Sequence, residues 1–359
     1  MIRRLVKRFL PGLLGALVIA VGISVFTTTT ATFRFYYSVT PLGSGHSIPN
    51  AINDIGQIVG VDYPKNNNGF GNAFVWENGT MRNIGNLGGR FSEAYDINNQ
   101  GQVVGISETS SKSVHSFLWQ AQNDTLNDLG LLGGGDKSFL WSINNNGQIA
   151  GESRTLANGS YNFREAVLRL NGRVVNLGTL GGELSAAFGI NNRRQIVGES
   201  SIASGQTHAF LWQNRQMIDL GTLGGEFSSA KTINNLGQVA GRSTILKPNP
   251  GTSYHCFLWS NQAMTDLTPN SPHDCYANSI NNRGTVVGNF AYSVLMNQRF
   301  YPFVWRDRTI TNLNSLLPPN SGWKLETAND INNNGQIVGT GRFNREIRGV
   351  LLTPITIAQ

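Results

Sequence analysis

Apolar and polar residues alternate along this chain in one phrase that occurs seven times. Its common form is Ile-Asn-Asn/Asp-x-Gly-Gln-Ile/Val-Val/Ala-Gly. The seven copies begin at Ile52, Ile97, Ile143, Ile190, Ile233, Ile280 and Ile331. Consecutive copies therefore start 43 to 51 residues apart. A period of about 46 residues is typical of β-propellers, in which each repeat forms one four-stranded blade.

Each repeat reads as four short strands, which we name A to D. In the second repeat the expected strands cover residues 94–98, 102–107, 115–119 and 126–129. The Asn-Asn-x-Gly sequence between A and B suits a tight turn. Apolar residues are consecutive in strands B and C, so they project from both faces of the sheet. A sheet that buries both faces between neighbours indicates a propeller blade, not the wall of an up-and-down barrel.

The two ends of the repeat region predict how the ring closes. The last repeat has strands A and B, then residues 349–354 as strand C, and the chain stops before a strand D. Residues 37–43 precede the first strand A and read as a spare strand D. We therefore expect an all-β, seven-bladed β-propeller whose N-terminal strand completes the last blade. An open solenoid would instead need a polar cap at each end.

Three phrases carry a family resemblance. The repeated Ile-Asn-Asn phrase, His-Ala-Phe-Leu-Trp at residues 208–212 and Asp-Leu-Gly-Thr-Leu-Gly-Gly at residues 219–225 resemble the HAF repeats of probable extracellular bacterial proteins. The match covers nearly all of residues 36–359. It implies export and a repeated β architecture, and it supplies no catalytic residue. The chain departs from the pattern in the fourth repeat, where Arg193 and Arg194 occupy the turn and the usual Gly is missing.

Residues 1–35 look like a targeting segment, and residues 36–359 like the propeller. Four cations lie within the first eight residues, and the largely apolar stretch 9–26 follows. This is the pattern of a secretory signal peptide or a signal anchor, and 18 residues of helix would nearly span the hydrocarbon core of a bilayer. We expect an apolar helix here, with the propeller outside the cytoplasm. Whether the segment is cleaved, or holds the protein in the membrane through residues 9–26, stays open.

Charge and cysteine content narrow the class of partner and the compartment. The net charge is +7, but residues 1–36 contain five of the 28 Lys and Arg and none of the 21 Asp and Glu. The propeller itself is thus almost neutral, and we expect no nucleic-acid partner. Cys256 and Cys275 are the two cysteines of the chain. In an exported protein a disulfide between them is the default expectation, with a free buried pair as the alternative.

The repeats differ most in the B–C and D–A links, which should gather at one end of the ring. Variable loops on a rigid scaffold commonly form binding sites. The predicted function is therefore a non-enzymatic binding or scaffolding propeller that recognises a protein or glycan through this loop face. The candidate ligand-binding residues are Lys65, Lys137, Tyr254, His273, Asp274 and Trp323.

The alternative is an extracytoplasmic hydrolase or lyase acting on glycans. Glycosidases usually need a pair of carboxylates, and the innermost strands offer Asp96 and Asp330 in blades that are two apart on the ring. We predict neither a metal nor a cofactor. Residues 330–335 match the opening of a calcium loop, but Gly341 stands where its closing Glu would be.

Overall fold

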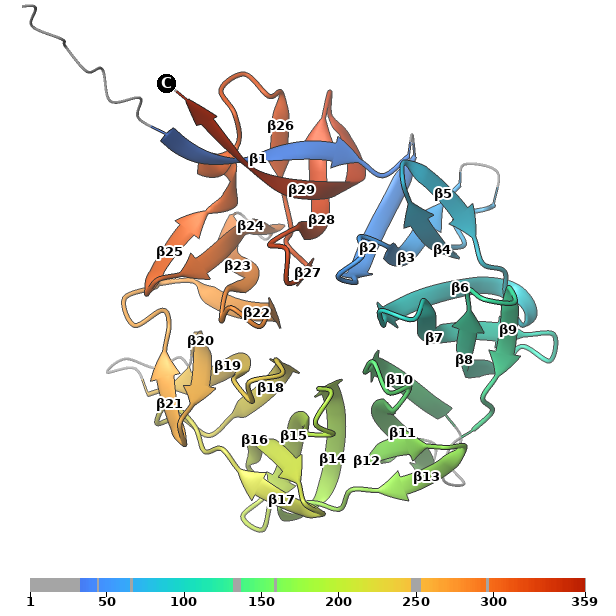
Figure 1. Ribbon diagram of the computed structural model, residues 1–359. Helices are drawn as coiled ribbons and strands as arrows, with labels where there is room; N and C mark the ends of the chain where they lie inside the picture. Colours follow the sequence, from blue (N-terminus) through green and yellow to red (C-terminus); the bar gives the residue numbers. More distant parts are fainter. Residues whose placement is uncertain are drawn as a thin grey trace, which may run out of the picture.

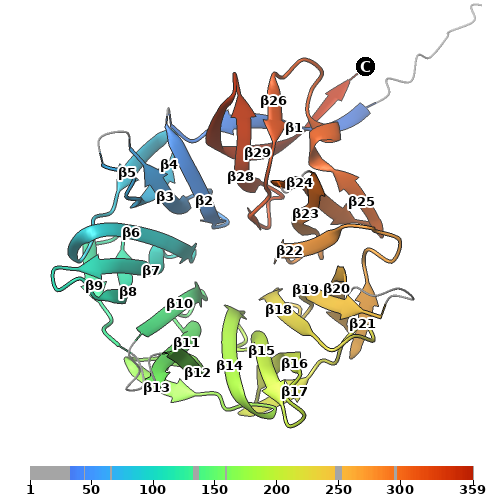
Figure 2. The same ribbon diagram turned by 180° about the vertical axis from the view of Figure 1, so that it is seen from behind.

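The computed structural model describes residues 33–43, 45–64, 67–131, 137–157, 160–246, 253–294 and 297–358. Seven small antiparallel sheets stand around a central axis (Figures 1 and 2), so the expected seven-bladed, all-β propeller is confirmed. The apolar helix expected within residues 1–35 falls almost entirely on residues 1–32, which lie outside the described residues. Within the described ranges, no helix is both long and apolar enough to cross a membrane.

Each blade is given from its innermost strand outward. Blade 1 contains β2 (His46–Ile52), β3 (Ile58–Tyr63), β4 (Asn72–Glu77) and β5 (Thr80–Asn83). Blade 2 contains β6 (Gly88–Ile97), β7 (Gln102–Thr109), β8 (Val114–Gln120) and β9 (Thr125–Asp128). Blade 3 contains β10 (Lys137–Ile143), β11 (Ile149–Ala157), β12 (Ser160–Leu170) and β13 (Arg173–Asn176). Blade 4 contains β14 (Gly181–Ile190), β15 (Ile196–Ile202), β16 (Thr207–Gln213) and β17 (Gln216–Asp219).

Blade 5 contains β18 (Ser228–Ile233), β19 (Val239–Ile245), β20 (Ser253–Ser260) and β21 (Ala263–Asp266). Blade 6 contains β22 (Asp274–Ile280), β23 (Val286–Val294), β24 (Asn297–Arg306) and β25 (Thr309–Asn312), and the short 3₁₀ helix η1 (Leu313–Leu316) follows it. Blade 7 is built from β26 (Trp323–Leu325) and β27 (Asp330–Ile331), β28 (Ile337–Phe343), β29 (Glu346–Ala358) and β1 (Phe33–Pro41).

The ring closes through β1, as the sequence predicts. This strand pairs antiparallel with β29, with Val39 opposite Leu352, and so becomes the outermost strand of blade 7 (Figure 1). Tyr37 and Leu42 are buried, with 3% and 0% of their surface exposed. Residues from both ends of the chain therefore share one hydrophobic core.

Packing between blades explains why apolar residues are consecutive. Phe117 and Trp119 of blade 2, both almost fully buried, form one cluster with Val59 and Val75 of blade 1. The Gly that ends each repeated phrase is required for a different reason. A Cβ atom at Gly105 would clash with the carbonyl oxygen of Glu93 on the innermost strand, because the innermost strand lies very close to the second strand at this point.

Two closed rings of hydrogen bonds tie the blades together at the A–B turns. In the first ring, the Nδ2 atom of the first Asn in each repeated phrase donates to the main-chain oxygen of its counterpart in the next blade, at 2.9–3.1 Å. Its members are Asn53, Asn98, Asn144, Asn191, Asn234, Asn281 and Asn332. In the second ring, the main-chain N–H of the next residue donates to the side-chain Oδ1 of its counterpart, at 2.8–2.9 Å. Its members are Asp54, Asn99, Asn145, Asn192, Asn235, Asn282 and Asn333. The repeated asparagines thus hold the blades together in addition to forming turns.

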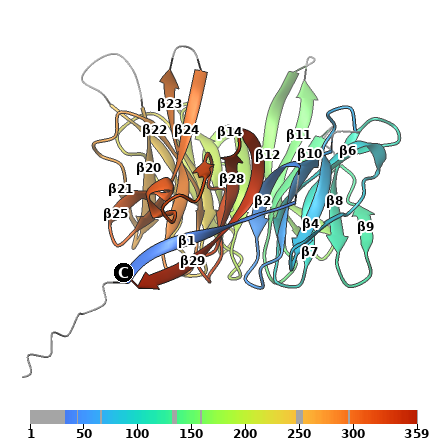
Figure 3. The same cartoon turned by 90° about the horizontal axis from the view of Figure 1, so that it is seen from above.

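The two ends of the ring differ. The A–B and C–D turns lie at one end, which we name the turn face. The B–C and D–A links lie at the other, which we name the loop face. Figure 3 shows the hairpins β11–β12 and β23–β24 extending beyond their neighbours on the loop face.

Candidate functional site

A cavity of about 480 Å³ lies on the propeller axis, and all seven innermost strands line it. It is formed by residues that precede the asparagine rings by a few positions in each innermost strand, so it lies on the loop-face side of those rings. Pockets that bind small ligands commonly have volumes of roughly 300–1,000 Å³. The axial cavity is therefore of suitable size for a ligand.

A β-bulge in the innermost strand directs one side chain of each blade into this cavity. In blades 1 to 6 the pairing register with the second strand slips by one residue just before the repeated phrase. In blade 7 the inner strand is broken at the same place, between β26 and β27. Bulges commonly re-aim a side chain next to a functional site. The seven residues at this position all line the cavity: Asn50, Tyr95, Trp141, Phe188, Lys231, Asn278 and Asn329.

Blades 2 to 4 place an aromatic ring at the bulge position. The rings of Tyr95 and Trp141 lie 4.7 Å apart, and Trp141 also stacks on Phe139 at 5.4 Å. The Nε1 atom of Trp141 is buried, and it has no hydrogen-bond partner among the described residues. The Lys231 ammonium group of blade 5 lies 5.6 Å from the centre of the Phe188 ring. One side of the cavity is thus an aromatic arc that ends in a cation.

Blades 6, 7 and 1 place an amide at the bulge position. Each of these asparagines donates through Nδ2 to a main-chain oxygen of the next blade, namely Ala328, Pro49 and Ala94. Asn50 also donates to the Glu93 carboxylate at 3.1 Å. Within the described ranges, the Oδ1 atoms of these three asparagines form no hydrogen bond with the protein. Polar acceptors therefore face the aromatic arc across the axis.

Asp96 and Asp330 both line the cavity, and each carboxylate connects neighbouring blades. Asp96 accepts hydrogen bonds from the Ser142 hydroxyl group and the Ile143 N–H, both at 2.8 Å. Asp330 accepts from the Ser279 hydroxyl group at 2.6 Å and from the Ile52 N–H at 2.7 Å. Desolvation raises the pKa of Asp96 to about 7, and the charge of Asp330 adds to this effect. Desolvation also raises the pKa of Asp330.

Glu93 and Lys231 also line the cavity, and the pKa of each is shifted in the direction that favours its neutral form. Desolvation raises the pKa of Glu93, although its hydrogen bond with Asn50 opposes this. Desolvation lowers the pKa of Lys231, although the Asp96 charge opposes it. The pKa values of Asp96, Asp330, Glu93 and Lys231 are thus all shifted towards the neutral form of the group.

The six predicted loop-face residues do not form one cluster. Tyr254 and Asp274 are in contact, because the Tyr254 N–H donates to Asp274 Oδ1 at 2.9 Å. The Tyr254 ring also lies 4.7 Å from the Arg242 guanidinium group, and Arg242 lines a second pocket of about 320 Å³ that shares Phe188, Lys231 and Asn278 with the axial cavity. Two of the six predictions thus lie beside the axial site.

The remaining predicted residues lie elsewhere. His273 packs edge-on against the Tyr301 ring of blade 6. Lys137 begins β10 in blade 3. Trp323 is partly buried, where it packs on Phe343 and against the hydrophobic core of blade 7. Lys65 lies outside the described residues. Ligand binding by these residues stays a prediction.

Cys256 and Cys275 form a disulfide in the structure, with their Cα atoms 5.2 Å apart. Cys256 lies in β20 of blade 5 and Cys275 in β22 of blade 6. Both are fully buried. The disulfide therefore joins adjacent blades next to the 320 Å³ pocket.

The bulge residues were not among the predicted site residues. Variation was expected in the links between strands, whereas the variable position that lines the axial cavity lies inside a strand. The signal was present two residues before each phrase-opening Ile, where the seven repeats carry Asn, Tyr, Trp, Phe, Lys, Asn and Asn. Variation among large side chains at one position of a near-uniform repeat indicates a role other than shared packing.

Comparison with known proteins identifies the fold alone. The β-propeller domain of the trilobed protease from Pyrococcus furiosus, which has an open velcro topology, aligns with a TM-score of 0.58 at 10% identity, over 90% of this chain and 94% of that chain. Oligogalacturonate lyase from Vibrio parahaemolyticus aligns with a TM-score of 0.55 at 10% identity, over 90% and 97%. A puromycin-hydrolyzing peptidase from Mycobacterium tuberculosis aligns at 0.52 and 11% identity, over 90% of this chain but 56% of that one. No family model and no curated protein matches the sequence.

Proposed function

We propose that this chain is an exported, non-enzymatic binding propeller of the HAF-repeat type, which admits a glycan into the axial cavity from the loop face. A protein ligand on the same face is the alternative within this class. The repeated phrases support the HAF assignment, and the basic and apolar N-terminal segment supports export, either as a cleaved signal or as a membrane anchor. The disulfide agrees with an oxidising compartment.

One observation carries the proposal. The blades repeat the same core, turn and ring residues, yet the position that faces the axis holds three aromatic rings, a lysine and three amides. A position needed only for packing would repeat like its neighbours. Divergence of this position, gathered around one cavity, is what a binding site on a symmetric scaffold requires.

The chemistry of the cavity favours a glycan. Sugar rings combine apolar C–H faces, which pack on aromatic side chains, with hydroxyl groups, which pair with amides. The aromatic arc of Tyr95, Trp141 and Phe188 supplies the first kind of contact. The free Oδ1 acceptors of Asn50, Asn278 and Asn329 supply the second. Pockets of this type bind through apolar walls and orient the ligand through a few polar groups.

Binding is favoured over catalysis because the two axial aspartates already have partners. Each carboxylate accepts hydrogen bonds from a hydroxyl group and from main-chain N–H groups of its own and the next blade. These bonds connect blades, and they occupy the oxygens that a nucleophile or general base would use. The hydrolase or lyase alternative has one observation in its favour, a pKa of about 7 for Asp96 beside Asp330, which suits a general acid.

A glycan array and a screen for glycan cleavage with the full-length protein separate these functions. We expect binding without turnover. Phe188→Ala should weaken binding roughly tenfold, because it removes an aromatic face from the contact. Phe300→Ala is the matched control, since Phe300 lies on blade 6 away from the cavity and is 41% exposed.

Two results would contradict the proposal. If Phe300→Ala weakened binding and Phe188→Ala did not, the ligand site would lie outside the axial cavity. If the protein cleaved a glycan and Asp96→Asn or Asp330→Asn abolished turnover, the enzyme alternative would be correct.

A further inference from the structure

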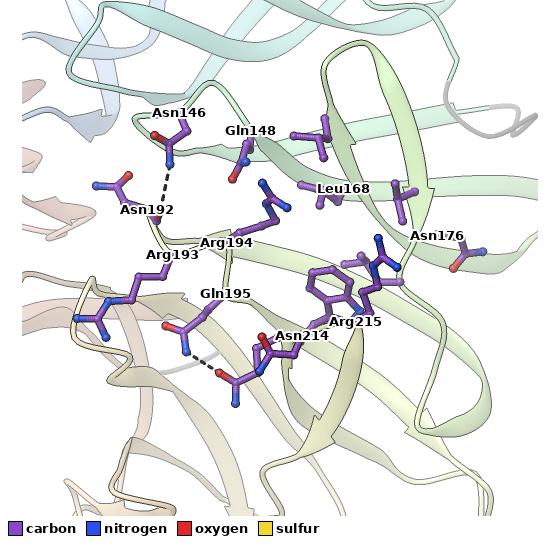
Figure 4. A pocket seen from close by; sticks show the side chains of 15 residues that line it. Asn146, Gln148, Leu168, Asn176, Asn192, Arg193, Arg194, Gln195, Asn214 and Arg215 are labelled. Atoms are coloured by element: carbon purple, nitrogen blue, oxygen red, sulfur yellow. Dashed lines mark hydrogen bonds between the residues drawn. The ribbon is translucent and has the colours of Figure 1, made fainter.

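A larger pocket lies on the opposite end of the ring, between blades 3 and 4 (Figure 4). Its volume is about 880 Å³, and its walls are formed by the A–B turns of both blades, the outer strands of blade 3 and the C–D turn of blade 4. The apolar part of the lining comes from Leu168, Leu170, Val175, Leu177 and Trp212. The polar part is made largely of amides: Asn146, Gln148, Asn176, Asn192, Gln195, Gln213 and Asn214.

Three arginines give this pocket a strong positive charge. Arg193, Arg194 and Arg215 line it, and no Asp or Glu does. None of the three forms an ion pair with the part of the chain that the structure describes. In Figure 4, Arg194 and Arg215 extend into the pocket from different sides, whereas Arg193 points away from them. Guanidinium groups that lack a carboxylate within the protein remain available for an anion from outside.

The backbone at Arg194 shows that this side chain is retained at a conformational cost. The equivalent turn position in the other six blades is a Gly with φ between +69° and +89°. Arg194 adopts φ +60°, a left-handed conformation that side chains with a Cβ disfavour. Nothing in the turn requires arginine, because Gly forms it elsewhere in the ring. Non-glycine residues held in such conformations tend to cluster at functional sites.

The lining of the pocket holds Arg194 in place without neutralising it. The Gln148 amide lies against Arg194: in one orientation its oxygen accepts from Asn144 Nδ2 at 2.8 Å, and in the flipped orientation that oxygen lies 3.0 Å from Nε and from one terminal nitrogen of Arg194. The Gln195 and Gln213 side chains are joined by a 2.7 Å hydrogen bond (Figure 4). A neutral amide orients the guanidinium group but leaves its charge unpaired.

We propose that this pocket binds an acidic oligosaccharide through its carboxylate or sulfate groups. Arg194 and Arg215 pair with the anionic groups, the surrounding amides bind hydroxyl groups, and the exposed Val175 with the Trp212 edge accepts an apolar sugar face. A concave pocket with an apolar floor fits an oligosaccharide better than a flat bilayer surface. The site lies on the turn face and does not depend on the axial cavity.

The left-handed conformation of Arg194 allows a substitution that should leave the fold intact. Arg194→Gly restores the residue found in the other blades, so the variant should melt at or above the temperature of the wild type. Arg215→Gly removes the second cation from a position with φ +63°. Arg308→Gly is the matched control, because Arg308 also has φ +60° but lies in the outer turn of blade 6.

Calorimetric titrations of the full-length protein would use a heparin hexasaccharide, hexagalacturonate and neutral maltohexaose. We expect both acidic probes to bind with salt-dependent affinity and maltohexaose to bind at least roughly tenfold more weakly. Arg194→Gly and Arg215→Gly should each weaken acidic binding roughly tenfold or more. Arg308→Gly should leave it unchanged.

Several outcomes would overturn the inference. It fails if neither acidic probe binds, if maltohexaose binds equally well and loses that binding in Arg194→Gly, or if both pocket variants keep the wild-type affinity. Hexaglutamate or anionic phospholipid vesicles that bind more tightly, and lose binding in Arg194→Gly, would assign the pocket to a peptide or a lipid headgroup. Binding of neutral glycans in the axial cavity is measured separately through Phe188→Ala, so failure of one site leaves the other standing.

Discussion

The ring formed by the first Asn of each repeated phrase should contribute strongly to the stability of the propeller. A substitution of Asn234 measures this contribution best. Its Nδ2 donates to the Asn281 main-chain oxygen at 2.9 Å and to Gln238 Oε1 at 2.7 Å. Its Oδ1 accepts from the N–H groups of Leu236 and Gln238, both at 3.0 Å. Asn234 is 4% exposed, so water cannot replace these partners after a substitution.

Asn234→Ala removes all four hydrogen bonds. At about 1 kcal/mol for each bond, with some partners left buried and unpaired, the free energy of unfolding should fall by about 4 kcal/mol. For a chain of this length the melting temperature should fall by roughly 6 °C. Asn235→Ala is the matched control in the second ring, where the side chain accepts a single bond from Asn192 N. It should cost about 1 kcal/mol.

Urea titrations with calorimetry would measure both variants, and equal denaturant slopes would show that the folded states are comparable. The interpretation of the ring as an inter-blade tie is wrong if Asn234→Ala costs less than Asn235→Ala. It is also wrong if Asn234→Asp, which keeps the acceptor but loses both donors, is as stable as the wild type at neutral pH.

Three further predictions concern closure, the disulfide and pH. Leu42→Ala should lower the free energy of unfolding by about 2–5 kcal/mol, measured by urea titration, because Leu42 is fully buried where the two chain ends meet. Reduction of the Cys256–Cys275 disulfide, which spans 19 residues, should cost about 3 kcal/mol in a melt with and without reductant, and Cys256→Ser should abolish the effect of reductant. Because the pKa of Asp96 is raised to about 7, the folded state retains a proton that the unfolded chain releases above about pH 4. Stability should therefore fall as the pH rises from about 4 to about 7, and Asp96→Asn should flatten the fall; an identical slope in both proteins would contradict it.

Much of the fold could be predicted because every repeat carries the same kinds of core residue at the same positions. The consecutive apolar residues of strands B and C, the Asn-Gly turns and the spare strand at residues 37–43 each had one reading, and those readings agreed. The role of the asparagines was only partly visible. Asn53 and its counterparts do form turns, but a single sequence does not show that their Nδ2 atoms reach the next blade, because that contact exists only once the ring is closed.

The site was harder to predict, for a physical reason. Side chains alternate strictly along a regular strand, so an alternating pattern assigns Tyr95 and Asp96 to opposite faces. A bulge inserts one residue and breaks this rule. The first and second strands approach closely beside it, and the trace of this approach in the sequence is the Gly that closes each phrase. Arg194 is a similar case. The missing Gly reads as a weakness of the fourth repeat, whereas the structure shows a left-handed arginine at the edge of a charged pocket.

Two levels along the propeller axis have different roles. One holds the blades together, and the other lines the axial cavity. At the A–B turns, every blade contributes the same asparagine to a closed ring, and a substitution of this asparagine removes its side-chain bond to the next blade. A few residues earlier in the same strands, the bulge side chains touch the cavity and contribute little to the shared core, so they are free to differ. Asp96 and Asp330 lie between these two levels, and their bonds to Ile143 and Ile52 of the next blade belong with the ring. Conversion of such a propeller to a new ligand should therefore proceed through the bulge positions of blades 2 to 5. Unlike the three asparagines, which bond to the next blade, the aromatic and lysine side chains there form no hydrogen bond between blades within the described residues.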